Sequence, residues 1–294
     1  MKHNDLSFII GADGLLGSSL TSTLKSHNES FIGSTRRRDA LGSKDRIYLD
    51  LAASWDNSWS PPSHVSVVYL CAAVASQEKC RLDPEGSARI NIENTVNIAK
   101  KCAENNIFFI FPSTNLVFDG TVPFRKPDET RSPITEYGRQ KAEAEKQLLA
   151  LGENVAIVRF TKIISPGIPL IHTWCDNIRA SRTIYPFSNY VMSPVPNILA
   201  SEILYRIAQK RICGIHQVSG PQDITYAEAA YHIAKRLHVE ENLVRPITIE
   251  DAGVAIEYNP AFTTLDSTKT EKKVGIHIPD AFSSLDLVFF HGGK

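Results

Sequence analysis

Two side chains near the middle of the chain have the types and spacing needed for proton transfer. Tyr137 and Lys141 stand four residues apart, so on a helix they share one face. An ammonium beside a phenol favours the phenolate, which predicts a tyrosine pKa below its ordinary value of about 10. Thr114 directly follows a strongly apolar run and offers a hydroxyl that could orient a carbonyl. These three residues predict a site in which Tyr137 exchanges a proton with a carbonyl oxygen.

A glycine-rich turn near the start of the chain is typical of a dinucleotide-binding loop. Gly11, Gly14 and Gly17 follow an apolar run and precede a helical pattern. Their GxxGxxG spacing allows a tight turn and a close approach of the backbone to phosphate. The helix that starts there directs its free N–H groups at the same place. We therefore predict that a dinucleotide binds with its pyrophosphate at this turn.

The segment about 20 residues further on predicts which dinucleotide binds, because sites for NAD usually hold a carboxylate there. This chain has Ser34, Thr35, Arg36 and Arg37 instead, and its first acid is Asp39. Hydroxyl and guanidinium groups suit the 2′-phosphate of NADP, although a solvated basic loop would look the same. The predicted cofactor is NADP(H). Its predicted contacts are Gly11, Asp13, Gly14, Leu15, Leu16, Gly17, Ser34, Thr35, Arg36, Arg37, Asp50, Leu51, Cys71, Ala72, Ala73, Tyr137 and Lys141.

Short apolar runs alternate with helical patterns in the first part of the chain, as in parallel βαβ units. The length of 294 residues and the 43% hydrophobic content suit a large α/β domain with a smaller partner region. The expected strands are Phe8–Ile10, Ser30–Gly33, Arg46–Leu49, Val65–Cys71, Ile107–Pro112 and Val155–Phe160. The expected helices are Leu16–Ser26, Ala88–Asn105 and Tyr137–Leu151.

The pattern is less regular beyond Phe160. Ser165–Pro169 and Ser193–Asn197 read as loops, and Asn197–Gln209 reads as a helix that leads to a strand at Gly214–Val218. The rest predicts one helix, Tyr226–Leu237, among long loops. We therefore expect a doubly wound parallel sheet of the Rossmann type over residues 1–164, to which 197–220 returns. Residues 165–294 are expected to form mainly a smaller substrate-binding region.

Charge and cysteine content exclude several classes of function. Lys plus Arg and Asp plus Glu both number 32, so no overall field favours nucleic acid or an anionic membrane. The five cysteines form no CxxC pair and no metal-ligand spacing, which predicts no metal and a reducing compartment. The run Leu6–Ile10 is too short for a signal peptide, and no stretch reaches the roughly 18 apolar residues of a membrane span. We expect a cytoplasmic protein.

With these motifs, the chain resembles the extended short-chain dehydrogenase/reductase family, and within it the dTDP-4-dehydrorhamnose reductase group. The likeness covers nearly the whole chain, including Gly11–Gly17, Pro133–Lys141 and Thr264–Lys269, and it is most specific from Ser113 to Gly120. The resemblance implies that Thr114, Tyr137 and Lys141 are the hydroxyl, acid and lysine of a catalytic triad. It also implies reduction of a nucleotide-linked 4-keto sugar by NADPH, and it leaves a homodimer open.

Some residues depart from the pattern of that group. Asn115 stands where the group usually has Asp, Arg125 and Lys126 lie in a longer loop, and the substrate loop reads Ser188-Asn189 and Ser193-Pro194-Val195. These departures leave the sugar undetermined. For the substrate diphosphate, the available cationic groups between 162 and 197 are Arg179, Arg182 and His172, which could equally form a solvated helix face.

Other activities of the family rank below the reductase. The dehydratases of the family carry Asp-Glu after the catalytic threonine, and Asn115-Leu116 cannot supply that acid and base. Epimerases share the tyrosine and lysine but usually hold NAD, whereas Arg36 and Arg37 favour NADP. A different class is an NADP-binding regulatory subunit without turnover, because the β-subunits of methionine adenosyltransferase resemble the same family.

Overall fold

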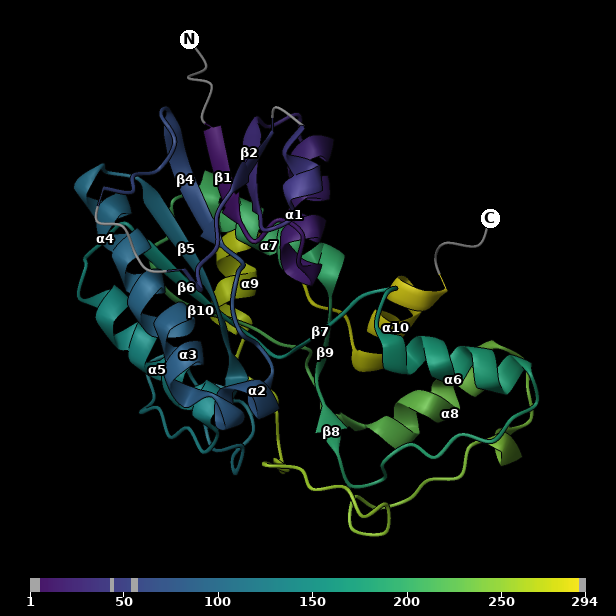
Figure 1. Cartoon of the computed structure of the whole chain (residues 1–294). Helices are drawn as coiled ribbons and strands as arrows, with labels where there is room; N and C mark the ends of the chain where they lie inside the picture. Colours follow the sequence, from purple (N-terminus) through teal and green to yellow (C-terminus); the bar gives the residue numbers. More distant parts are fainter. Residues whose placement is uncertain (1–5, 43–44, 54–57, 291–294) are drawn as a thin grey trace.

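A parallel sheet forms the central layer of the computed structural model, which describes residues 6–42, 45–53 and 58–290 (Figure 1). Its strand order is β10-β6-β5-β4-β1-β2-β3, with every pairing parallel. The strands are β1 (Leu6–Ile10), β2 (Phe31–Thr35), β3 (Arg46–Tyr48), β4 (Val65–Leu70), β5 (Phe108–Thr114), β6 (Val155–Phe160) and β10 (Gly214–Val218). The chain order reverses between β1 and β4, where folds of this type bind ligands at the carboxyl ends of the strands. The predicted α/β class with a Rossmann-type parallel sheet is confirmed.

Helices cover both faces of this sheet, which explains why its strands are apolar on both sides. Along β5, Phe108 and Ile110 face one core, and Phe109 and Phe111 face the other. The first core is closed by α1 (Leu15–Ser26), α7 (Asn197–Gln209) and α9 (Thr268–Val274). The second is closed by α4 (Thr95–Glu104) and α5 (Glu136–Leu149).

The predicted single helix Ala88–Asn105 is a composite. It begins with α3 (Pro84–Ala88), continues through a π-helical stretch, η2 (Arg89–Asn94), and ends with α4. A short helix, α2 (Gln77–Leu82), precedes it. The wider π turn cannot be seen in a 3.6-residue periodicity, and such stretches are frequent at functional sites.

A smaller lobe lies beyond the carboxyl edge of the sheet, where α6, α8 and α10 pack together (Figure 1). These helices are α6 (Pro169–Arg179), α8 (Tyr226–Arg236) and α10 (Ala281–Phe289). Two short pairings connect the lobe to the sheet: β7 (Lys162–Ile164) with β9 (Pro194–Pro196), and β8 (Val191–Met192) with β11 (Ile224–Thr225). The 3₁₀ turns are η1 (Arg38–Gly42), η3 (Asn115–Val117) and η4 (Glu241–Leu243).

Two expectations for this second half were wrong. The predicted loop Ser193–Asn197 contains strand β9, because two prolines are tolerated in a three-residue strand that pairs only with β7. The remainder beyond Val218 was expected to hold one helix, Tyr226–Leu237, but α9 and α10 follow it. Helix α6, earlier in the chain, was not predicted. Pro169 is the first residue of α6, a position at which proline starts a helix rather than breaking it.

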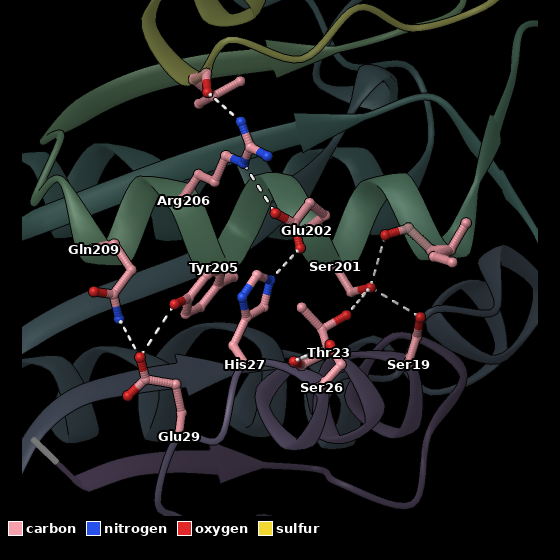
Figure 2. Close-up of polar contacts among 12 residues, drawn as sticks. Ser19, Thr23, Ser26, His27, Glu29, Ser201, Glu202, Tyr205, Arg206 and Gln209 are labelled. Atoms are coloured by element: carbon pink, nitrogen blue, oxygen red, sulfur yellow. Dashed lines mark hydrogen bonds and ion pairs between the residues drawn. The ribbon is translucent and has the colours of Figure 1, made fainter.

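A polar interface fixes α7 against α1, the helix that follows the glycine turn (Figure 2). The hydroxyls of Ser19 and Thr23 lie 3.0 and 2.8 Å from that of Ser201. His27 contacts Glu202 at 2.9 Å and stacks on Tyr205, with ring centroids 4.1 Å apart. Because α7 directly follows β9, these contacts hold the connection to the smaller lobe in place relative to the glycine turn.

None of the helices among the described residues is long and apolar enough to cross a bilayer.

Candidate functional site

The glycine turn between β1 and α1 is shaped by contacts that leave no room for side chains. Gly11 has a φ of +86°, and a Cβ there would lie 2.6 Å from the Ala72 nitrogen. At Gly17 a Cβ would collide with the carbonyl oxygen of Gly11. Gly14 caps α1 without a side-chain hydrogen bond, and the first turn of the helix contains no acid. The free N–H groups of this helix end are therefore available to an anion such as a pyrophosphate.

A cavity of about 420 Å³ opens beside this turn, at the carboxyl ends of β1, β2 and β4. Of the predicted cofactor residues, Gly11, Asp13, Gly14, Ser34, Thr35, Arg36, Asp50, Leu51, Cys71, Ala72 and Ala73 line it. Leu15, Leu16, Gly17, Arg37, Tyr137 and Lys141 do not; Leu16 packs into the core, and Leu15 is exposed. Sequence reasoning missed Leu49, Ala52, Val74, Ala75, Ser76, Lys79 and Ile90. Most of these lie within a few residues of a predicted strand end, which was the available signal.

The two predicted phosphate-binding arginines lie in different environments. Arg36 lines the cavity, whereas the Arg37 Nη2 pairs with the Asp13 Oδ1 at 3.1 Å. The Thr35 hydroxyl donates to the other oxygen of Asp13. The hydrogen bond from Thr35, with help from Arg37, holds the pKa of the Asp13 carboxyl below its ordinary value. Arg36 is therefore the more available of the two for a ligand phosphate.

Thr114 and Tyr137 line a second cavity, of about 330 Å³, which shares Ala75 with the first. Thr114 ends β5, and Tyr137 lies in the first turn of α5. Thr135 caps α5 by accepting a hydrogen bond from the Gly138 N–H at 3.0 Å, which fixes the start of the helix. The two predicted reactive residues therefore line the same cavity.

Lys141 lines neither cavity and is buried, with 3% of its surface exposed. Its Nζ donates to the Pro112 carbonyl oxygen at 2.6 Å and sits 3.6 Å from the centroid of the Phe111 ring. The lysine is thus tied to the strand that ends in Thr114.

Burial controls the protonation of both α5 residues. It raises the pKa of the Tyr137 phenol above its ordinary value, and it lowers the pKa of Lys141 to about 7. The expected lowering of the Tyr137 pKa by the Lys141 ammonium is therefore not met, because desolvation of the phenol is the larger effect. The phenol therefore holds its proton at neutral pH, as a proton donor must.

A buried carboxylate that sequence reasoning missed joins α5 to β5. Glu145 follows Lys141 by one helical turn and is fully buried. Its carboxylate accepts from the Ser113 hydroxyl at 2.6 Å, from the Arg159 Nη2 at 2.7 Å and from the Arg131 Nη1 at 3.2 Å. Since Ser113 precedes Thr114, this network helps to fix the threonine. The i, i+4, i+8 spacing of Tyr137, Lys141 and Glu145 was the signal in the sequence.

The π-helical stretch η2 joins the lining of the cofactor-side cavity to α5 through side-chain amides. The Asn91 Oδ1 accepts from the Val74 N–H at 2.9 Å, and its Nδ2 donates to the Gln140 Oε1 at 2.8 Å. Asn94, at the end of the same stretch, donates to the Leu51 carbonyl at 2.9 Å. Val74 and Leu51 both line the cofactor-side cavity, so η2 fixes its wall relative to α5.

The cations predicted to meet a substrate diphosphate do not line either cavity. Arg179 lies 4.0 Å from Asp176 on its own helix, Arg182 donates to the Asn177 side chain at 3.0 Å, and His172 is exposed. Of the predicted substrate segment 162–197, five residues line the second cavity: Lys162, Ile163, Tyr190, Val191 and Met192.

The unusual residues of the substrate loop have structural partners. Asn189 donates to the Glu250 carboxylate at 2.7 Å and accepts from the Ile249 N–H at 3.0 Å. Ser193 is buried and lies 3.1 Å from the Ser219 hydroxyl. These contacts hold the loop in place beside the second cavity.

The comparison with known protein families decides where this chain belongs. The family model described as the RmlD substrate binding domain matches residues 7–289. The chain belongs to this family. The resemblance to extended short-chain dehydrogenases/reductases of the dTDP-4-dehydrorhamnose reductase group is thereby confirmed.

Individual proteins and solved structures are similar over nearly the whole chain. Methionine adenosyltransferase 2 subunit beta from Xenopus tropicalis is 27% identical over 282 residues, which cover 92% of this chain and 82% of that protein. The crystal structure of a dTDP-4-dehydrorhamnose reductase from Clostridium acetobutylicum superposes with a TM-score of 0.82 and 22% identity, covering 96% and 98% of the two chains. The Bacillus anthracis dTDP-4-dehydrorhamnose reductase, solved with NADP, superposes with a TM-score of 0.81 and 18% identity, covering 97% of each chain.

Proposed function

We propose that this chain is an NADPH-dependent reductase of a nucleotide-linked 4-keto sugar. The observation that carries the proposal is that the two cavities share the lining residue Ala75. One cavity borders the uncapped N-terminus of α1, and the other is lined by Thr114 and Tyr137. A cofactor held at the helix end would therefore lie next to the cavity that contains the two reactive hydroxyls.

The residues present fit a nicotinamide dinucleotide. The glycine turn and the free N–H groups of α1 would hold the pyrophosphate, and Arg36 would hold the 2′-phosphate of NADP. When bound, the reduced nicotinamide supplies a hydride. Tyr137 would then give its proton to the substrate oxygen, and Thr114 would orient that oxygen through its hydroxyl.

Lys141 would steady β5 through its hydrogen bond to the Pro112 carbonyl oxygen. The region 165–294, apart from the segment 197–220, would contribute mainly to the substrate site. The solved Bacillus anthracis relative, whose structure contains NADP, supports the choice of NADP as the cofactor.

A second candidate function is that of a nucleotide-binding regulatory subunit without turnover. It is favoured by the 27% identity with the methionine adenosyltransferase subunit, which exceeds the identity with either solved reductase described above. The presence of Thr114, Tyr137 and Lys141 in the proposed triad positions favours the reductase instead.

The proposed function is tested by measuring NADPH oxidation against a panel of nucleotide-linked 4-keto sugars. We expect turnover with at least one of them. Interconversion of sugars without net consumption of NADPH would indicate an epimerase. Tight binding of NADP with no conversion of any sugar would contradict the reductase and favour the regulatory subunit.

The choice of cofactor gives a separate prediction. Arg36→Ala should weaken NADP by about tenfold or more and leave NAD nearly unchanged, because a charge-assisted hydrogen bond contributes about 1.5–3 kcal/mol. Adding Arg37→Ala should widen the difference between the losses of NADP and NAD affinity, since the Asp13 carboxylate would lose its arginine partner. Calorimetric titration with both cofactors measures this. Arg38→Ala is the control, because Arg38 lies over the Tyr48 ring outside the cavity lining; equal losses of NADP and NAD in Arg36→Ala would exclude the assignment.

A further inference from the structure

The second cavity contains an unusual electrostatic feature. Among the described residues that line it, Lys162 is the single charged side chain, and no aspartate or glutamate shares the lining. Its other walls combine the reactive hydroxyls with aromatic groups: Tyr190, Tyr226, Tyr258 and Phe160. A cavity that is otherwise neutral thus contains one positive charge.

The backbone of Lys162 is held firmly in place. Its N–H donates to the Ser193 carbonyl at 3.2 Å, and the Thr161 hydroxyl donates to the same oxygen at 2.7 Å. Lys162 also pairs with Pro194 between β7 and β9. In the sheet, Thr114 of β5 pairs with Phe160 of β6. Lys162 follows Phe160 by two residues along the chain.

The ammonium of Lys162 has no compensating charge in the part of the chain that the structure describes. It forms none of the ion pairs found among the described residues, although other lysines do, such as Lys101 with Glu104. Lys162 is an exposed residue in this lining, so a ligand can reach its ammonium from the solvent. An anionic group bound in the cavity would form a charge-assisted hydrogen bond with it, in place of the missing ion pair.

We propose that Lys162 binds an anionic group of the substrate, either phosphate or carboxylate, and that it sets the specificity of the reaction cavity. The inference rests on the proposed function, which makes the second cavity the substrate site. Lys162 takes the anion-binding role that the sequence suggested for Arg179, Arg182 and His172, because those three residues do not line that cavity. The anion is either the diphosphate that every nucleotide sugar carries or a carboxylate on the sugar itself.

The test is calorimetric binding to the full chain saturated with NADP, so that the cofactor cavity is occupied. The probes are the uridine and thymidine diphosphates, their glucose conjugates, and uridine diphosphate glucuronic acid. Lys162→Met removes the charge and keeps most of the aliphatic stem, whereas Lys162→Arg keeps the charge. Lys100→Met, on the exposed surface of α4, is the matched control for loss of one positive charge.

If the diphosphate is the anion, Lys162→Met should bind every probe about tenfold or more weakly. If the carboxylate is the anion, only the glucuronic acid conjugate should lose that affinity. In both cases Lys162→Arg should retain most of the binding, Lys100→Met should match the unmodified chain, and NADP affinity should stay constant.

Unchanged binding of all probes in Lys162→Met would overturn the inference, as would an unmodified chain that binds none of them. Turnover separates a failure of this inference from a failure of the proposed function. If binding depends on the charge of Lys162 but no sugar is reduced by NADPH, the proposed reductase activity is refuted and the anion-binding role of Lys162 is not.

Discussion

Replacing Tyr137 with phenylalanine is expected to lower kcat by about 10²–10⁴ while NADPH affinity changes little. The change removes the proton that Tyr137 would give to the substrate oxygen, and it keeps the ring, which is 9% exposed. Steady-state kinetics with the best 4-keto sugar, together with calorimetric titration of NADPH, separates the two effects. Lys141→Met should lower both kcat and NADPH affinity, because it removes the hydrogen bond to the Pro112 carbonyl oxygen and the amine that would bind the ribose hydroxyls of the cofactor.

The matched control is Tyr258→Phe, which removes a phenol hydroxyl from the same cavity. We expect it to affect kcat much less than Tyr137→Phe, because Tyr258 is not paired with Lys141 on a helix face. Full activity in Tyr137→Phe would refute the proposed acid. Equal losses of kcat in Tyr137→Phe and Tyr258→Phe would show that removing either hydroxyl from the cavity slows the reaction, and would contradict a specific role for Tyr137 as the acid.

Replacing Glu145 with alanine is expected to lower the free energy of unfolding by about 3–5 kcal/mol. The Arg159 side chain is fully buried, and Glu145 is its counter-charge, with an Nη2 to Oε2 distance of 2.7 Å. Without the carboxylate, a buried guanidinium is left uncompensated, and the Ser113 hydroxyl loses its acceptor. Denaturant titration of the two proteins measures the difference.

Glu143→Ala is the matched control, because it removes a carboxylate from the same helix at a site that is 42% exposed. Its ion pair with Lys146 is long, at 3.9 Å, and exposed pairs contribute about 1 kcal/mol or less. If Glu145→Ala were no more destabilising than Glu143→Ala, the buried network would not hold α5 to β5 as the structure indicates.

The parts of the fold that were predictable are those with a strong local signal. Strand β10 has the predicted bounds Gly214–Val218, and α7 has the predicted bounds Asn197–Gln209, because each is a clear run of its own periodicity. Strands of two or three residues, such as β8 and β9, hold no periodic pattern and depend on their partners. Helix α6 does carry an apolar face in Ile171, Trp174 and Ile178, but the preceding glycine and prolines suggested a loop.

The site divides in a similar way. The glycine turn, Arg36, Thr114 and Tyr137 could be found because each follows a predicted strand or begins a predicted helix. Glu145 and Lys162 could not be assigned a role from the sequence, since their importance depends on which strands and helices meet around them. The direction of the Tyr137 pKa was also out of reach, because burial of the phenol is a tertiary property.

The most direct test of the account is to follow isotope from deuterium-labelled NADPH into a nucleotide-linked 4-keto sugar. We expect the product to gain one deuterium at the former keto carbon, in equal amount to the NADP formed, and far less product to form with Tyr137→Phe. Tight binding of NADPH with no deuterium in any sugar would contradict the proposed reductase.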